Sequence, residues 1–113
     1  MTYTLRVPAN LEEEIQSWNL PPEIALHLAR ESKSARLLEP PFEAMETVSS
    51  IANVYRWTVV SGPPHWLRLD FKISVANQSE ELHMMEAKCM RPLGGFLDEI
   101  LDVTAANRVD RPR

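Results

Sequence analysis

Apolar and polar residues alternate most regularly between His65 and Val75. Every second position of this segment is apolar, and these positions are Leu67, Leu69, Phe71, Ile73 and Val75. The positions between them are Trp66, Arg68, Asp70, Lys72 and Ser74. Because successive side chains of a strand point to opposite faces, the pattern predicts a long strand that is buried on one face. The other face of this strand would carry two cations.

Three further strands are predicted around this one. Residues 2–7 alternate in the same way and stop at Pro8, which has no backbone N–H to give to a sheet. Residues 54–60 are aromatic and β-branched, and the turn at residues 61–64 would join them to the long strand as a hairpin. Residues 82–88 follow another turn and predict the fourth strand. The last three strands would therefore form an antiparallel meander.

The segment after the first strand predicts a helical hairpin. Asn10 is placed to cap the first helix, and Glu13, three residues later, would complete a capping box. The spacing i, i+4, i+7 gives this helix one apolar stripe, formed by Leu11, Ile15 and Trp18. The first helix would therefore pack on the sheet through this stripe.

A second helix is predicted from residue 21 to residue 38, between two pairs of prolines. Glu31 lies in the middle of its apolar face. Either the helix bends within residues 31–34, or this face is only partly buried. Residues 42–52 have weak periodicity and are expected to form a connection that packs Phe42 inward.

The order strand, helix, helix, strand, strand, strand predicts an α+β domain. In it, the helical hairpin would pack on one face of a mainly antiparallel four-stranded sheet. This domain would cover residues 1–93. Residues 94–113 would form a short C-terminal helix and a frayed tail, and the apolar residues of that helix are Phe96, Leu97, Ile100, Leu101 and Val103.

Composition limits the class of protein. The chain has 113 residues, which is enough for one domain with one core. Its formal net charge of -4 argues against a protein that coats nucleic acid, although it permits a small basic site. The single cysteine, Cys89, excludes an internal disulfide and a Cys-rich zinc site. With no signal peptide or membrane span in the sequence, a cytoplasmic protein without a membrane role is expected.

The predicted sheet brings cations from three segments toward one face. Arg68 and Lys72 are four residues apart on one strand and would share a face over about 13 Å. Arg56 lies on the neighbouring strand, while Lys88 and Arg91 lie on the fourth strand and its exit. Arginine suits a bidentate grip on phosphate, and a lysine of depressed pKa suits proton transfer. Five cations could thus converge on one phosphate.

The same residues also have a plainer interpretation. Cations that alternate with apolar residues are typical of any exposed sheet face, where Asp70 would pair with them as a solvated charge ladder. His83 could be a general acid or base, or a partly buried structural histidine. Trp57 and Trp66 could stack on RNA bases, although Trp57 is expected in the core. The three histidines are too scattered to predict a metal site, and no motif predicts a cofactor.

The order of these elements at this length resembles the toxins of the RelE/ParE superfamily from bacterial toxin–antitoxin systems. The resemblance covers about residues 3–91. Tyr55-Arg56-Trp57 stands where the family often has a tyrosine–arginine pair, and His65-Trp66-Leu67-Arg68-Leu69 stands where it has a further arginine-bearing strand. The resemblance implies a toxin that an antitoxin protein neutralises, and that either cuts messenger RNA on the ribosome or binds DNA gyrase.

Two hypotheses are carried forward. In the first, the chain is a RelE-like, ribosome-dependent and metal-independent endoribonuclease that inhibits translation, with catalytic residues Arg56, Arg68, Lys72, His83, Lys88 and Arg91. In the second, it is a non-catalytic protein of the same fold, either a gyrase-type inhibitor or an inert relative that binds an antitoxin. The acidic balance favours the second, as does the segment from Glu86 to Arg91. Nuclease members usually end their last strand with a catalytic histidine, arginine or tyrosine, and here only Lys88 and Arg91 could serve as cations and no tyrosine follows residue 55.

Overall fold

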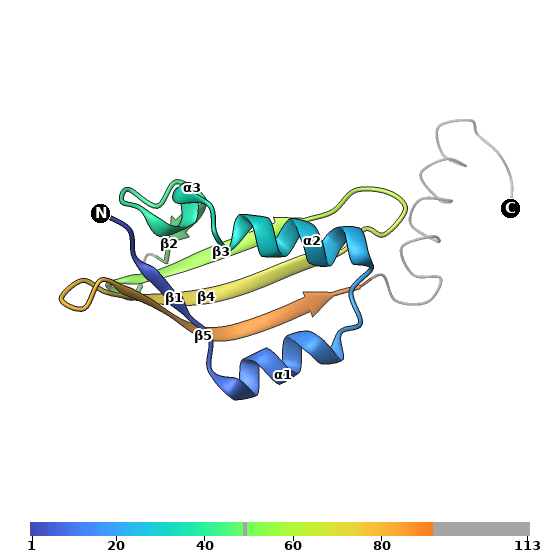
Figure 1. Ribbon diagram of the computed structural model, residues 1–113, viewed down its shortest axis with the longest axis horizontal. Helices are drawn as coiled ribbons and strands as arrows, with labels where there is room; N and C mark the ends of the chain where they lie inside the picture. The colour runs from blue at the N-terminus through green and yellow to red at the C-terminus, as the bar shows by residue number, and fades with distance from the viewer. Residues whose placement is uncertain (49, 92–113) are drawn as a thin grey trace, which may run out of the picture.

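The protein is an α+β domain built on one mixed sheet (Figure 1). The computed structural model describes residues 1–48 and 50–91. Its five strands lie in the order β1-β5-β4-β3-β2, and β1 is parallel to β5 while the other neighbours are antiparallel. The strands are β1 (Thr4–Arg6), β2 (Met45–Thr47), β3 (Val54–Val60), β4 (Arg68–Ala76) and β5 (Glu81–Met90). The predicted α+β class is confirmed.

The predicted strand number is wrong, because four strands were expected and the sheet has five. The additional strand, β2, has only three residues and pairs with β3 through Met45↔Trp57 and Thr47↔Tyr55. Three residues are too few to establish a period of two, so this strand leaves almost no pattern in the sequence. The meander of β3, β4 and β5 is antiparallel as predicted, and β1 adds the parallel edge.

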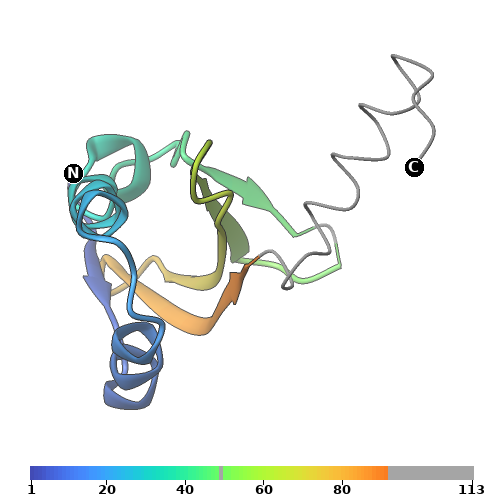
Figure 2. The same ribbon diagram turned by 90° about the vertical axis from the view of Figure 1, so that its right-hand side faces the viewer.

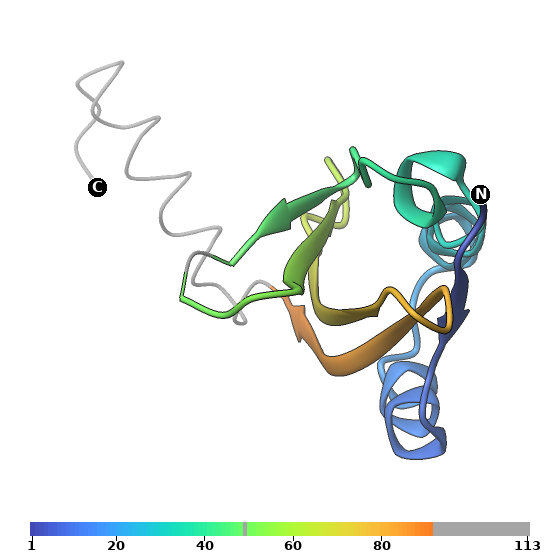
Figure 3. The ribbon, with the colours of Figure 1, turned by 90° about the vertical axis from the view of Figure 1, so that its left-hand side faces the viewer.

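The alternation along β4 is confirmed, and it divides the sheet into two faces. Leu69, Phe71 and Ile73 are buried on what we call the inner face, where they form the centre of the core. The intervening polar residues lie on the opposite, open face. Figures 2 and 3 show that the sheet curves around the core and that the helix α2 (Pro22–Glu31) lies on its concave side.

A β-bulge changes which residues of β5 face outward. Lys72 pairs with Glu86, but the next residue, Ile73, pairs with Met84, so Met85 is left over. Because of this extra residue, Met84 is buried on the inner face while Glu86 lies opposite Lys72. Without the bulge, the residues of β5 after Met85 would change faces. The bulge therefore turns the end of β5 so that Lys88 joins the open face.

The first two helices diverge instead of packing as the predicted hairpin. The helix α1 (Ala9–Ser17) lies along β5, and Figure 1 shows it apart from α2. Residues of both helices line a cavity of about 970 Å³. The predicted cap at Asn10 is also wrong. The helix begins two residues earlier than predicted, with Pro8 in the N-cap position and no side-chain cap. The backbone carbonyl of Pro8 instead accepts from the N–H of Glu12 at 2.9 Å.

The second predicted helix is interrupted, as one of its two alternatives required. It consists of α2 and the short helix α3 (Ala35–Leu38), separated by residues 32–34. Ser34 caps α3 by accepting from the backbone N–H of Arg36 at 3.2 Å. The break lets both pieces bury an apolar side chain, Ile24 from α2 and Leu37 from α3.

Two further predictions concern the C-terminal segment and the absence of a membrane span. The boundary at residue 93 and the C-terminal helix within residues 94–113 lie outside the described residues. Among the helices that the structure describes, none combines the length and the apolar character needed to cross a bilayer.

Candidate phosphate-binding surface

Four of the six predicted site residues line one hollow on the open face of the sheet. Arg56 comes from β3, Arg68 and Lys72 from β4, and Lys88 from β5. The hollow has a volume of about 260 Å³, and its lining includes the carboxylates Asp70 and Glu86. We call this feature the cationic hollow. It contains four cations and two carboxylates, so its formal charge is positive although that of the chain is negative.

The strand register arranges these residues in three rows across the sheet. Arg56 and Lys72 are directly opposite each other, and Glu46 on β2 and Glu86 on β5 flank them. The next row is Thr58, Asp70 and Lys88, and the last is Val60, Arg68 and Met90. Like charges directly opposite on a sheet repel each other. The pair Arg56 and Lys72 is therefore a place where a bound anion would relieve repulsion.

Asp70 holds Arg68 in a defined orientation. Its Oδ1 accepts from the hydroxyl of Thr58 at 2.9 Å and from Nε of Arg68 at 3.1 Å. The Asp70 side chain is only 16% exposed, whereas that of Arg68 is 50% exposed. A guanidinium has five N–H donors, and the bond through Nε leaves the terminal amino groups free to bind phosphate. The predicted pairing of Asp70 with Arg68 is thus present, and it orients the cation.

The other three cations are less constrained. Lys72 lies 3.5 Å from Glu86, and both side chains are well exposed, so this ion pair contributes little to stability. Within residues 1–48 and 50–91, no carboxylate lies within 4.0 Å of the cationic groups of Arg56 or Lys88. The charge-ladder interpretation therefore applies to two of the four cations, Arg68 and Lys72. Within the described part of the chain, Arg56 and Lys88 have no ion-pair partner and could bind an anion.

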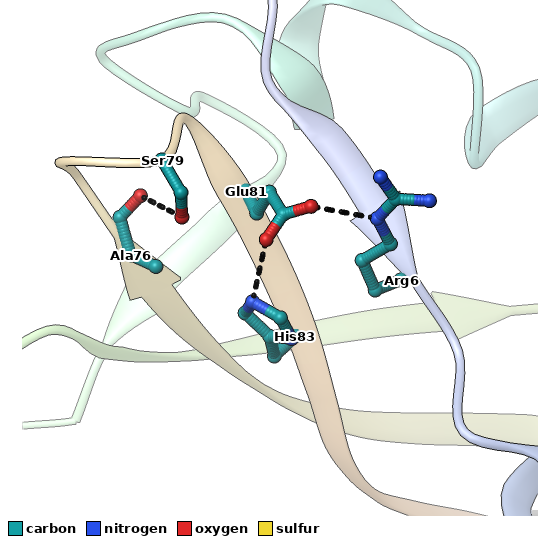
Figure 4. A network of polar contacts seen from close by, with 5 residues as sticks. All are labelled: Arg6, Ala76, Ser79, Glu81 and His83. Carbon is teal, nitrogen blue, oxygen red and sulfur yellow. Dashed lines mark hydrogen bonds and ion pairs between the residues drawn. The ribbon is translucent and has the colours of Figure 1, made fainter.

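The structure does not bring His83 and Arg91 into the hollow. Arg91 is exposed just after the end of β5 and is not among the residues that line the hollow. His83 stands opposite Ser74 beyond the bulge, and its ring is turned to Glu81 at 3.2 Å (Figure 4). Its side chain is 47% exposed, so it is not the partly buried histidine of the alternative interpretation. The sequence offered no signal for this placement, because it depends on the register of β5.

Glu81 links His83 to the edge strand β1. Its carboxylate also accepts from Nε of Arg6 at 2.7 Å (Figure 4). The hydrogen bond from Arg6 is the main reason that the pKa of Glu81 lies below its ordinary value, and the charge of His83 adds to the effect. The unfolded chain would take up a proton near the ordinary glutamate pKa of about 4.3. This contact therefore stabilises the fold above that pH, and the contribution is lost as the pH falls through the lower pKa of the folded state.

We expect Arg6→Gln to raise the pKa of Glu81 more than His83→Gln does, because the bond from Arg6 is the larger cause of its shift. The measurement is an NMR titration of the Glu81 side-chain carboxyl between about pH 2.5 and 6, a range centred on the ordinary pKa. Wild-type protein and the two variants are compared in the same buffer. An equal response to the two substitutions, or the reverse order, would contradict this assignment.

The described part of the chain shows neither an activated cysteine nor a group of metal-binding side chains. Burial raises the pKa of the Cys89 thiol, and the nearby charge of Arg91 offsets this only in part. A neutral thiol is a poor nucleophile. Among the described residues, no three of the His, Cys, Asp and Glu side chains are grouped as metal ligands. The chemistry of the open face is therefore that of cations, carboxylates and hydroxyls.

The larger cavity, between α1 and α2, has a different character. Its floor is the inner face of the sheet, where it reaches Trp57, Phe71 and Met84, and its walls include Leu5, Ile15 and Leu28. Glu12 and Lys33 are the charged residues in its lining. This cavity is suited to apolar groups and offers no arrangement for acid–base chemistry.

The fold and the open face define the protein as a small α+β domain with a cationic hollow on its sheet. No protein-family model, no curated protein and no solved structure matches the chain. The functional argument therefore rests on the surface itself.

Proposed function

We propose that this chain is a RelE-like toxin of a type II toxin–antitoxin system, an endoribonuclease that cuts messenger RNA on the ribosome without a metal and so inhibits translation. The observation that carries the proposal is the convergence of Arg56, Arg68, Lys72 and Lys88 from three strands on one hollow. An RNA phosphate is a ligand of the right charge for such a site, and the sequence resemblance supplies the class of protein.

The hollow contains groups for each part of the reaction. RNA cleavage of this kind begins when the 2′-hydroxyl attacks phosphorus and the bond to the 5′ oxygen breaks, which leaves a 2′,3′-cyclic phosphate and a 5′-hydroxyl. Arg56 and the free amino groups of Arg68 would bind the phosphate oxygens and stabilise their added charge. Glu86 would accept the proton of the 2′-hydroxyl, and Lys88 would give one to the leaving oxygen.

A second candidate function is a non-catalytic binding protein of the same fold, either a gyrase-type inhibitor or a relative that only binds its antitoxin. The observation in its favour is the engagement of the carboxylates, since Asp70 is bonded to Arg68 and Glu86 is paired with Lys72. In addition, His83, the expected acid or base, is paired with Glu81 outside the hollow. Such an arrangement would bind an anion without transferring protons.

Both functions imply a cognate antitoxin as partner and action in the cytoplasm, and the first also implies contact with the ribosome. Two surfaces suit an antitoxin segment. An extended segment would add to an edge strand, β1 or β2, and an amphipathic helix would enter the apolar cavity between α1 and α2. A small neighbouring gene for such a protein would support the toxin–antitoxin role in either case.

The test is induced expression of the untagged protein in a bacterial host without its genomic neighbours. We expect growth arrest, with new messenger RNA ends inside translated codons when these are mapped by primer extension. Arrest without new ends would favour the second candidate. Normal growth at good soluble yield would contradict the toxin proposal.

A further inference from the structure

Trp66 combines two features that an ordinary structural tryptophan does not have. Its surface is 45% exposed, and its backbone φ is 53°, in the left-handed region. Large side chains rarely adopt this conformation, which glycine and asparagine tolerate far better. Residues kept in such a conformation are concentrated at functional sites, where the surrounding structure maintains them. An exposed tryptophan in a strained loop is therefore a reason to look for a ligand.

The loop that carries Trp66 is held firmly by other residues. Ser61 and Leu67 close it, because the N–H of Ser61 donates to the carbonyl of Leu67 at 2.9 Å and the N–H of Leu67 donates to Oγ of Ser61 at 3.0 Å. His65 is bonded to Glu23 at the start of α2. Leu67 is buried and supplies the apolar anchor of the loop. The fold thus holds Trp66 in place without using its indole ring in the core.

The surroundings of Trp66 suit a nucleotide. Trp66 precedes Arg68 by two residues, so their Cα atoms are at most about 7 Å apart. Arg68 lines the cationic hollow, and among the described residues its guanidinium is paired only with Asp70, through Nε, so its terminal amino groups remain free. Two exposed apolar residues, Val60 and Met90, stand on either side of Arg68 in the register. An aromatic ring, a guanidinium and an apolar rim are the components of a base-plus-phosphate subsite.

We infer that Trp66 stacks on a base of single-stranded RNA while Arg68 binds the adjoining phosphate. This inference rests on the proposed function, because it takes RNA as the ligand of the cationic hollow. Stacking is tolerant of base identity, so the subsite would hold the strand beside the hollow without reading its sequence. It accounts for the strained backbone, since a glycine or asparagine would fit the turn better but would offer no ring.

The test uses the full chain and a fluorescein-labelled single-stranded RNA of about ten nucleotides, a length within the range that single-strand sites bind. Trp66→Asn is expected to keep or raise the melting temperature, because asparagine tolerates the left-handed backbone. The same variant should weaken RNA binding about tenfold to a hundredfold, while Trp66→Phe keeps most of the affinity. Affinity measured by fluorescence anisotropy and stability measured by thermal unfolding together separate a binding role from a structural one.

Three results would overturn the inference in distinguishable ways. If Trp66→Asn binds RNA like the wild type, while Arg56→Gln with Lys88→Gln binds weakly, the stacking role is wrong and the proposed function stands. If Trp66→Asn lowers the melting temperature and the affinity together, the tryptophan is a structural residue. If wild-type protein does not bind the RNA at all, the stacking inference is wrong, while the proposed action on the ribosome is judged separately by growth arrest and the mapped messenger RNA ends.

Discussion

Replacing Phe71 by alanine is expected to destabilise the fold by about 3–5 kcal/mol, the usual cost of removing a buried aromatic side chain. Phe71 is 1% exposed at the centre of the inner face. Its ring stacks on that of Trp57 at a centroid distance of 4.7 Å, and Trp18 approaches it at 6.2 Å. Such a loss is a large share of the roughly 5–15 kcal/mol that stabilises an ordinary domain. Urea denaturation of the purified variant measures it.

Two controls show whether the loss comes from burial. Phe71→Leu keeps most of the apolar volume and should cost clearly less than the alanine substitution. Leu26→Ala removes an exposed apolar side chain from α2 and should change the free energy of unfolding by less than about 0.5 kcal/mol. A loss below about 1 kcal/mol for Phe71→Ala would mean that this residue does not hold the three aromatic rings together.

The alternation that predicted β4 is a property of one segment, which is why the sequence was sufficient to find it. Its buried and open faces follow from the period of two, whatever strands lie beside it. The presence of helices after β1 was also predictable, and so was the start of α2, since prolines and apolar stripes are local signals. The start of α1 was not, because Pro8 begins this helix through its backbone carbonyl and a side-chain cap was expected at Asn10.

Features that arise between segments could not be predicted in the same way. The parallel pairing of β1 with β5 joins Leu5 to Leu82 across most of the chain. The bulge opposite Lys72 depends on how two strands align, and no residue type marks it in the sequence. Yet this bulge decides that Lys88 faces the same side as Arg68. The sequence identified the four cations by their charge alone, whereas the register of β3, β4 and β5 determines that they line one hollow.

His83 shows the limit most clearly. Its residue type suggested acid–base chemistry, and its position in a strand was predicted correctly. Nothing in the sequence marked Glu81 as its partner, and the approach of Arg6 depended on the parallel edge strand. The ionic network that includes His83 therefore became visible only when two distant segments, β1 and β5, were placed side by side.

Replacing Arg56 and Lys88 together by glutamine is expected to abolish growth arrest and to weaken RNA binding at least tenfold. Neither residue has an ion-pair partner in the described chain, so the substitutions leave no orphaned carboxylate, and the fold should remain intact. Each phosphate contact to a single strand contributes about 0.7 to the slope of log affinity against log salt. The double variant should therefore lower that slope by about 1.4, which anisotropy titrations at several salt concentrations measure.

A matched control distinguishes phosphate binding at the cationic hollow from attraction by the net charge of the protein. Arg30→Gln with Arg36→Gln makes the same change in net charge on two exposed helical residues that lie outside the hollow. If the cationic hollow binds phosphate, this control variant should have the wild-type slope of log affinity against log salt and should still arrest growth. Equal losses in both double variants would assign RNA binding to the overall charge and contradict a site. If Arg56→Gln with Lys88→Gln loses RNA binding but still arrests growth, toxicity acts through another target, as the non-catalytic candidate requires.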